Sequence, residues 1–121
     1  MSPQMAVASS SSIVSPVSQG AGTLNATGVD ILDYEGVVEF VQNLGAITGS
    51  IGTNKLQHSD TQGGTYTDVD QGGQTLGTTA NAISSVKINV SEIKRWVRYT
   101  AVITTGPVLL SVTLAGFKKY R

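Results

Sequence analysis

The chain has 121 residues, of which 40% are hydrophobic and 13% are charged, and its eight basic and eight acidic side chains cancel. This length predicts one compact domain, and the zero net charge gives no electrostatic attraction to nucleic acid or to an anionic membrane. The absence of cysteine excludes disulfides, thiolate nucleophiles and cysteine-ligated zinc.

No Lys or Arg precedes Lys55, and no apolar run approaches the roughly 20 residues that a membrane span needs. We therefore expect a protein made in the cytoplasm, with no membrane partner.

The first 29 residues contain no charged side chain and include four consecutive serines, Ser9 to Ser12. This low-complexity composition predicts a flexible, uncharged N-terminal arm over residues 1–29, followed by a single β-sandwich domain over residues 30–121. A tail that is disordered throughout is the alternative, because terminal segments order only when something holds them in place.

Three apolar residues interrupt the polar composition of the arm: Ile13, Val14 and Val17. They are too few for a core of their own, but their burial on a neighbouring subunit would be favourable. We therefore expect these residues to bind a partner and to become ordered on assembly.

After the arm, short runs of β-branched and aromatic residues alternate with Gly, Asn, Asp and Ser clusters, which predicts strands joined by turns. Residues 36–43 form the first expected strand, and residues 55–59 and 65–69 form an expected hairpin around two glycines. Residues 71–82 are rich in glycine and contain little to bury, so we expect a long loop there.

In three stretches near the C-terminus, the residue types alternate with the period of two that is typical of strands. These stretches are 86–90, 95–104 and 108–114. From this alternation we expect Leu110 and Val102 to be buried. A single short helical turn is expected near residues 91–94.

Seven or eight short strands in about 95 residues predict an all-β fold, an antiparallel β-sandwich. A jelly-roll-like arrangement is favoured over the immunoglobulin-like alternative because the Cys and Trp signature of immunoglobulin domains is absent. The sequence leaves the strand order open.

The charges are unevenly distributed along the chain. Seven of the eight acidic residues lie between Asp30 and Asp70, and seven of the eight basic residues lie from Lys87 onward. Either these charges pair inside one domain, or they form complementary patches between subunits. On the second interpretation Arg95 and Arg98 are candidate partner-binding residues.

The sequence offers little for catalysis or for binding a metal or cofactor. Ser59 and Asp60 follow the single histidine, His58, but adjacency in sequence does not create the spatial relay of a catalytic triad. A zinc site needs three or four N or S ligands. Residues 68–73 lack the later acidic ligands of a calcium loop and are interpreted as an acidic turn. We therefore expect no enzymatic activity, no metal and no cofactor.

Residues 94–99 interleave basic and aromatic side chains, as single-stranded nucleic acid sites do. The neutral net charge and the strand alternation instead favour a core position for Trp96 or Tyr99, so we expect no nucleic acid partner.

Three segments together resemble the small structural proteins of tailed bacteriophage heads, with the resemblance extending over residues 30–116. The segments are Val38-Glu39-Phe40-Val41-Gln42-Asn43-Leu44-Gly45, then Lys55-Leu56-Gln57-His58-Ser59-Asp60 leading to Tyr66-Thr67-Asp68-Val69, and then Lys94-Arg95-Trp96-Val97-Arg98-Tyr99.

The resemblance implies a capsid cement or decoration protein that binds the outside of the major capsid lattice and stabilises the head. It also implies a location on the capsid surface of the virion, after synthesis in the host cytoplasm. The implied partners are the major capsid protein and the chain itself, as a homo-oligomer of which a trimer is one form. The alternative is a receptor- or glycan-binding module of a tail fibre, spike or neck, and a third hypothesis is an enzyme that uses His58.

Overall fold

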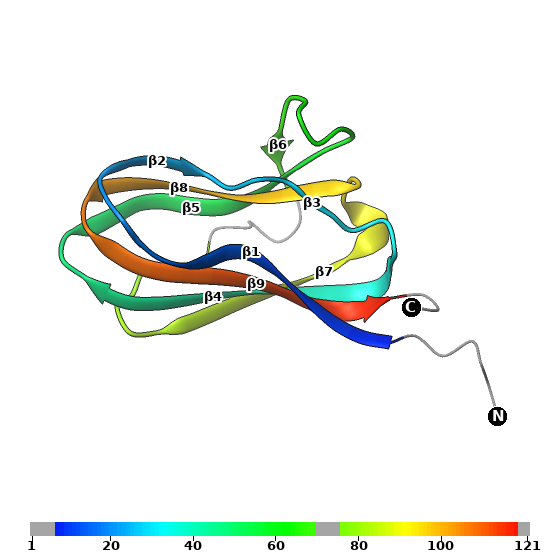
Figure 1. Ribbon diagram of the computed structural model, residues 1–121, viewed down its shortest axis with the longest axis horizontal. Helices are drawn as coiled ribbons and strands as arrows, with labels where there is room; N and C mark the ends of the chain where they lie inside the picture. The colour runs from blue at the N-terminus through cyan, green and yellow to red at the C-terminus, as the bar shows by residue number, and fades with distance from the viewer. Residues whose placement is uncertain (1–6, 70–75, 119–121) are drawn as a thin grey trace.

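The computed structural model describes residues 7–69 and 76–118, which form a sandwich of two antiparallel sheets (Figure 1). The first sheet has the order β1-β9-β4-β7, and its strands are β1 (Val7–Gln19), β9 (Val108–Lys118), β4 (Tyr34–Ile47) and β7 (Ile83–Asn89). The second has the order β2-β8-β5-β6, and its strands are β2 (Gly22–Asn25), β8 (Trp96–Thr105), β5 (Ser50–Ser59) and β6 (Thr67–Asp68). The short strand β3 (Val29–Asp30) also pairs with β8.

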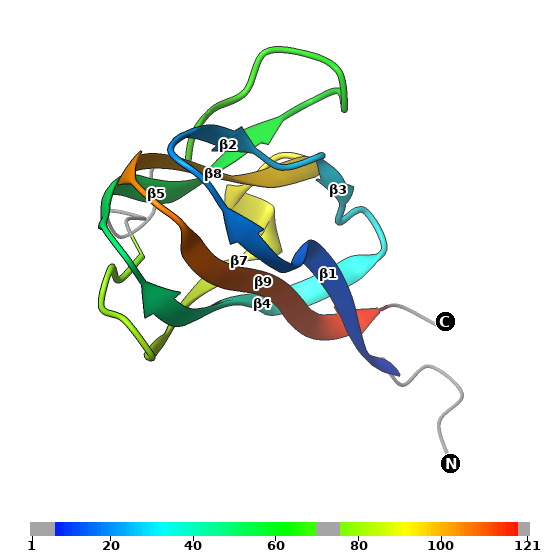
Figure 2. The same cartoon turned by 60° about the vertical axis from the view of Figure 1, so that its left-hand side comes forward.

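This strand order is that of a jelly roll. The strands form four antiparallel pairs, which are β1–β9, β2–β8, β4–β7 and β5–β6. These pairs are rolled together so that β9 also pairs with β4, and β8 also pairs with β5. The prediction of an antiparallel β-sandwich is confirmed, and the order of the strands selects the jelly roll over the immunoglobulin-like alternative. The two layers are separated clearly in Figure 2.

The core lies between the two sheets and is built from every second residue of the long strands. On β9 and β8, the inward residues are 0–3% exposed, and they are Val108, Leu110, Val112 and Leu114 on β9 and Val97, Tyr99, Ala101 and Ile103 on β8. Tyr34, Phe40 and Leu44 face them from β4. This is the pattern that a period of two predicts for strands with one face buried.

The prediction of a flexible N-terminal arm is wrong for residues 7–25. Strand β1 pairs with β9 from Val7 opposite Lys118 to Gln19 opposite Val108, and β2 pairs with β8. Because β9 pairs with β1 along nearly its whole length, it satisfies the backbone hydrogen bonds of a serine-rich segment that has few apolar side chains. The sandwich therefore includes residues that the sequence assigned to an arm, whereas residues 1–6 of that arm lie outside the described residues.

The other predicted elements agree with the structure, with one exception. Residues 36–43 lie within β4, β5 and β6 form the expected hairpin, and residues 76–82 contain no strand. The rest of the predicted loop, 71–75, lies outside the described residues. The expected helical turn is a 3₁₀ turn at Val90–Glu92. Val102, expected to be buried, is 43% exposed because it lies on the outward face of β8.

Candidate interaction surface

One end of the sandwich carries no charged side chain. This end, called here the uncharged end, consists of the β1–β2, β4–β5 and β8–β9 connections with their flanking strand ends, and the start of β7. Its residues are 17–24, 45–53, 80–83 and 102–110, and none of them is Asp, Glu, Lys, Arg or His. All charges of the described chain lie on other parts of the surface.

Close contacts bring these four segments together. The Thr48 N–H donates to the Pro107 carbonyl at 3.0 Å, and the Asn81 N–H donates to the Gly45 carbonyl at 2.9 Å. A side chain at Gly106 would lie about 3 Å from the backbone of the β1–β2 connection, so this glycine permits the turns to pack side by side. The uncharged end is therefore one continuous surface.

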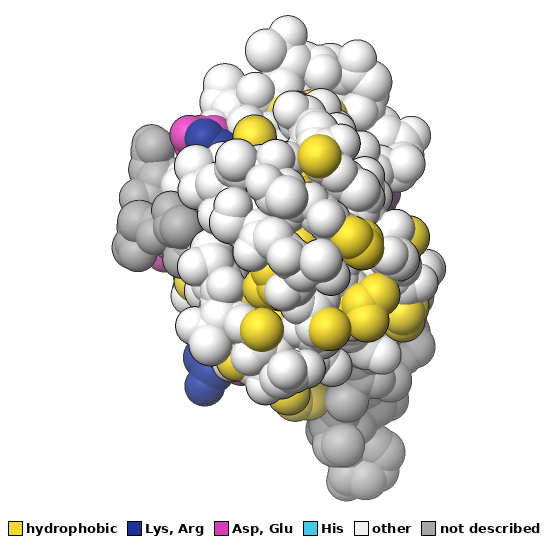
Figure 3. Space-filling view, turned by 90° about the vertical axis from the view of Figure 1, so that its left-hand side faces the viewer, with side chains coloured by type: hydrophobic (Ala, Val, Ile, Leu, Met, Phe, Trp, Pro, Cys, Tyr) yellow, Lys and Arg dark blue, Asp and Glu magenta, His cyan; other side chains and the backbone are white. Residues whose placement is uncertain are grey.

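The uncharged end also gathers exposed apolar side chains. Seven large hydrophobic side chains are exposed in the described residues, and four of them lie here: Val17, Ile83, Val102 and Leu109. Their exposed fractions are 41%, 68%, 43% and 45%. Figure 3 looks onto this end and shows hydrophobic side chains among uncharged surface, with charged side chains only toward the rim. Such a concentration of apolar groups is typical of a surface that another molecule covers.

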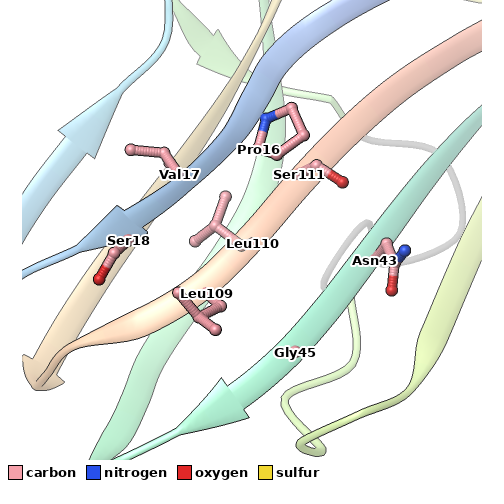
Figure 4. Close-up of a pocket in the computed structure, with 8 residues that line it drawn as sticks. All are labelled: Pro16, Val17, Ser18, Asn43, Gly45, Leu109, Leu110 and Ser111. Carbon is pink, nitrogen blue, oxygen red and sulfur yellow. The ribbon is translucent and has the colours of Figure 1, made fainter.

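An open groove of about 450 Å³ lies beside Val17 and Leu109 in the first sheet. It is lined by three neighbouring strands: Pro16, Val17 and Ser18 of β1, Leu109, Leu110 and Ser111 of β9, and Asn43 and Gly45 of β4 (Figure 4). A Cβ atom at Gly45 would lie 3.1 Å from Leu109 Cβ, so the glycine leaves room for the leucine side chain.

The chemistry of this surface suits binding and not proton transfer. None of the groove-lining residues has an ionisable side chain, so the groove contains no general acid, general base or charged ligand for a metal. It offers apolar side chains with a few neutral hydrogen-bonding groups from Asn43, Ser18 and Ser111. Attachment through such a surface depends on apolar burial and shape more than on charge.

The structure places the predicted partner-binding residues of the N-terminal segment in two different environments. Ile13 and Val14 are 7% and 8% exposed and belong to the core between the sheets, so they are not available to a partner. A register irregularity in the β1–β9 pairing lets both neighbours point inward. Val17 is 41% exposed and lines the groove.

Arg95 binds within its own chain. Its guanidinium donates two hydrogen bonds to the Asp30 carboxylate, at 3.0 Å from Nε and 2.8 Å from Nη2. These bonds hold the pKa of Asp30 below its ordinary value and raise that of Arg95. Lys94 and Asp60 form a looser pair, with 3.7 Å between Nζ and Oδ2. Charges from the acidic and basic segments therefore meet inside one chain.

Arg98 is also engaged locally. Its Nε and Nη2 atoms donate to Gln57 Oε1 at 3.0 and 2.8 Å, and its guanidinium lies 4.3 Å from the centre of the Tyr66 ring. Arg95 and Arg98 thus stabilise the β3–β8 and β5–β8 side of the second sheet. They lie away from the uncharged end.

The polar residues around His58 also have structural partners. His58 Nδ1 accepts a hydrogen bond from the Lys94 N–H at 3.2 Å, and Ser59 Oγ accepts one from the Thr61 N–H at 3.2 Å. Ser59 thus caps the turn that follows β5, and Asp60 faces Lys94.

Over residues 7–69 and 76–118, no group of three or more His, Cys, Asp or Glu side chains is placed to hold a metal ion. Asp68 pairs with Lys55 at 2.8 Å, and this hydrogen bond lowers its pKa. The remainder of the acidic turn, residues 70–73, lies outside the described part. No helix in the described residues is long and apolar enough to cross a membrane.

The sequence interpretation identified Val17 but missed Leu109 and Ile83. Leu109 lies between two inward residues of β9, and Ile83 begins β7. A signal was present, since four segments that are distant in the sequence all lack charge. Only the jelly-roll topology shows that these segments meet.

No protein-family model matches the chain, and no curated protein sequence matches it. Its structure is similar to that of the SPBc2 prophage-derived protein YomS, with a TM-score of 0.59 and 14% identity over 93% of this chain and 96% of that one. A structure of the infectious bursal disease virus Gx strain matches with a TM-score of 0.48 and 15% identity, over 93% of this chain and 32% of that chain. At these identities the likeness to YomS concerns the fold alone: the two proteins share one β-sandwich over nearly their full lengths.

Proposed function

We propose that this chain is a non-enzymatic structural protein of a phage virion, which binds the outside of the major capsid lattice through its uncharged end and stabilises the head. The observation that carries the proposal is the concentration of exposed apolar side chains, beside an open groove, on an end without charge. A stable monomer gains little from such a surface, whereas an assembled one buries it.

Two further observations support a place in a virion. The sandwich shares its fold with a prophage-derived protein over nearly the whole of both chains. The sequence segments quoted above resemble small head proteins of tailed bacteriophages. Because one fold serves many functions, these likenesses support the class of protein, and the uncharged end supports the mode of attachment.

The test is co-sedimentation of the purified chain with empty, expanded capsids of the phage that encodes it. We expect the chain to pellet with capsids and to raise the temperature at which they fall apart. Leu109→Asp places a charge on the uncharged end and should weaken binding about tenfold or more, as loss of an apolar anchor does in other interfaces.

Thr113→Asp is the matched control. Thr113 is exposed on the same strand and the same face as Leu109, four residues away, and it does not line the groove. This variant should bind capsids like the unmodified chain. Equal binding by both variants, or no binding by the unmodified chain, would contradict the proposal.

The alternative, a receptor- or glycan-binding module of a tail fibre, spike or neck, has less support. No aromatic or acidic side chain is among the residues that line the groove, although sugar sites commonly use such groups. Co-sedimentation with host cell envelopes and not with capsids would favour this alternative.

A further inference from the structure

The four edges of the two sheets differ in how they are protected against pairing with another strand. Unpaired edges expose backbone N–H and C=O groups, and natural proteins shield them with short strands, charges, prolines or bulges. The edge strands β2 and β6 have only four and two residues. The edge strand β7 carries Lys87 at its centre, opposite Glu39.

The remaining edge, β1, has thirteen residues and no charge. Its second half contains Pro16 and two irregularities in the pairing with β9, which interrupt the edge. Its first half, Val7–Ser12, pairs with β9 in unbroken register and contains neither proline nor charge. This six-residue stretch is the one long regular edge in the described residues without a protecting feature.

We infer that the Val7–Ser12 edge pairs antiparallel with the same edge of a second copy, which joins the two first sheets into one eight-stranded sheet across a two-fold axis. Two identical edge strands are self-complementary, because each presents alternating donors and acceptors to the other. None of the first 29 residues is charged, so the two edge strands bring no like-charged side chains of their own together.

The geometry restricts the register of the pair. Ser11 faces inward, because its hydroxyl lies 3.1 Å from the Tyr34 hydroxyl, whereas Ser10 and Ser12 are exposed. Directly opposed residues of an antiparallel pair point to the same face of the sheet. Ser10 must therefore lie opposite an outward-facing residue of the second copy. A two-fold axis at Ser10 meets this condition, because it places Ser10 of one copy directly opposite Ser10 of the other.

Cross-linking tests this register, because the chain has no cysteine of its own. Ser10→Cys should give disulfide-linked dimers under mild oxidation, whereas Ser12→Cys should not, because an axis at Ser10 places the two Ser12 residues about 14 Å apart, beyond the reach of a disulfide. Ser85→Cys is the matched control: Ser85 is an exposed serine on the outward face of β7, the opposite edge of the same sheet. We expect no linked dimer from the control.

Sedimentation of the isolated chain tests the association itself. The unmodified chain should change from monomer to dimer as concentration rises, and Ser10→Lys should raise the dissociation constant about tenfold or more, as edge lysines oppose pairing. Ser85→Lys should not change it.

Three results would overturn the inference: a monomer at every concentration, a dimer that Ser10→Lys leaves intact, or a closed trimer. A monomer whose capsid binding is lost on Ser10→Lys would assign the edge to a strand of another protein. Cross-linking and sedimentation of the isolated chain need no capsid. The inferred dimer can therefore be disproved while the proposed function holds, and the proposed function can be disproved while the dimer is confirmed.

Discussion

The Tyr99 hydroxyl donates a 2.7 Å hydrogen bond to Gln42 Oε1, and this bond joins the two sheets inside the core. Asn54 Nδ2 donates to the same oxygen at 2.6 Å, and Gln42 Nε2 donates to the Gly77 carbonyl at 2.7 Å. All three side chains are at most 1% exposed. Buried polar groups with partners constrain neighbouring elements, so this cluster fixes how β4 lies against β5 and β8.

The ionisation of Tyr99 should make the fold sensitive to alkali. Burial raises the pKa of Tyr99 from its ordinary value of 10.0 to about 12. The folded chain thus favours the neutral phenol. The contribution of Tyr99 to the free energy of unfolding is therefore complete below pH 10 and is lost as the pH rises through 12. The loss should be on the order of 2 kcal/mol in the free energy of unfolding.

Tyr99→Phe separates this effect from the other groups that titrate at high pH. The variant should lose about 1 kcal/mol near neutral pH, because one hydrogen bond is removed while Gln42 Oε1 keeps the one from Asn54. Denaturant unfolding between pH 9 and 12 should show a smaller decline for the variant. Parallel declines would exclude Tyr99 as the cause.

Truncation of two adjacent leucines on β9 should affect different properties of the chain, stability for one and capsid binding for the other. Leu110 is 3% exposed in the core, so Leu110→Ala should cost about 2 to 4 kcal/mol in the free energy of unfolding. Leu109 is 45% exposed, and Leu109→Ala should change stability by no more than about 0.5 to 1 kcal/mol while weakening capsid binding. Thermal and denaturant unfolding check both values. Similar losses of unfolding free energy in the two variants would show that the inward and outward faces of β9 are wrongly assigned.

The strands after residue 30 could be predicted because their alternation is set by burial of one face. On β9 the inward set is plain, since every second residue from Val108 to Leu114 is large and apolar. On β8 both sets contain apolar residues, so alternation identified the strand but not its inward face, and Val102 was assigned to the wrong side. Tertiary packing decides such cases.

The first strand could not be predicted because its stability comes from its neighbour. Within residues 10–19 of β1, the part of the strand whose burial is described, only Ile13 and Val14 are buried apolar residues, and the pairing irregularity that turns both inward breaks the period of two. The serines gain order from backbone bonds to β9, whose paired residues lie about one hundred positions further along the chain. The candidate surface could not be predicted for the same reason, since its four segments are distant in the sequence and lie together only in the folded jelly roll.

Deletion of residues 1–20 should therefore unfold the chain or leave it strongly destabilised. The deletion removes all of β1, exposes the edge of β9 and takes Ile13 and Val14 out of the core. Circular dichroism and thermal unfolding of the truncated chain measure the effect. A truncated chain with an unchanged unfolding midpoint would show that the segment contributes nothing to the sandwich.

The Asp30–Arg95 pair should make the fold sensitive to acid. The hydrogen bonds from Arg95 lower the pKa of Asp30, so the folded chain favours the carboxylate. This stabilisation is present above the pKa of an unfolded aspartate, about 3.9, and is lost as the pH falls through the lower folded value. Asp30→Asn should be less stable than the unmodified chain at pH 7, and the two should converge near pH 2.

Asp60→Asn provides the comparison for Asp30→Asn. The Asp60 side chain is 81% exposed and lies 3.7 Å from Lys94, so its contribution should be smaller. Urea unfolding at both pH values measures the differences. An equal loss of unfolding free energy in the two variants would show that the bidentate geometry of the Asp30–Arg95 pair adds no stability.

The last prediction concerns salt and the two arginines. Both are engaged within the chain, so Arg95→Glu with Arg98→Glu should destabilise the isolated domain by setting a carboxylate against Asp30 and removing the contacts to Gln57 and Tyr66. Where the double variant remains folded, its capsid binding should match that of the unmodified chain, because the attachment surface contains no charge.

Salt distinguishes this mode of attachment from complementary charged patches. Exposed charges are screened beyond about 8 Å at physiological ionic strength, whereas apolar burial is not weakened by added salt. Co-sedimentation with capsids should therefore stay constant or increase from low to high salt. Binding that falls steeply with salt, and that is lost in a double variant as stable as the unmodified chain, would instead place Arg95 and Arg98 at the contact between subunits. The uncharged end would then be free of the lattice, and Leu109→Asp should leave capsid binding unaltered.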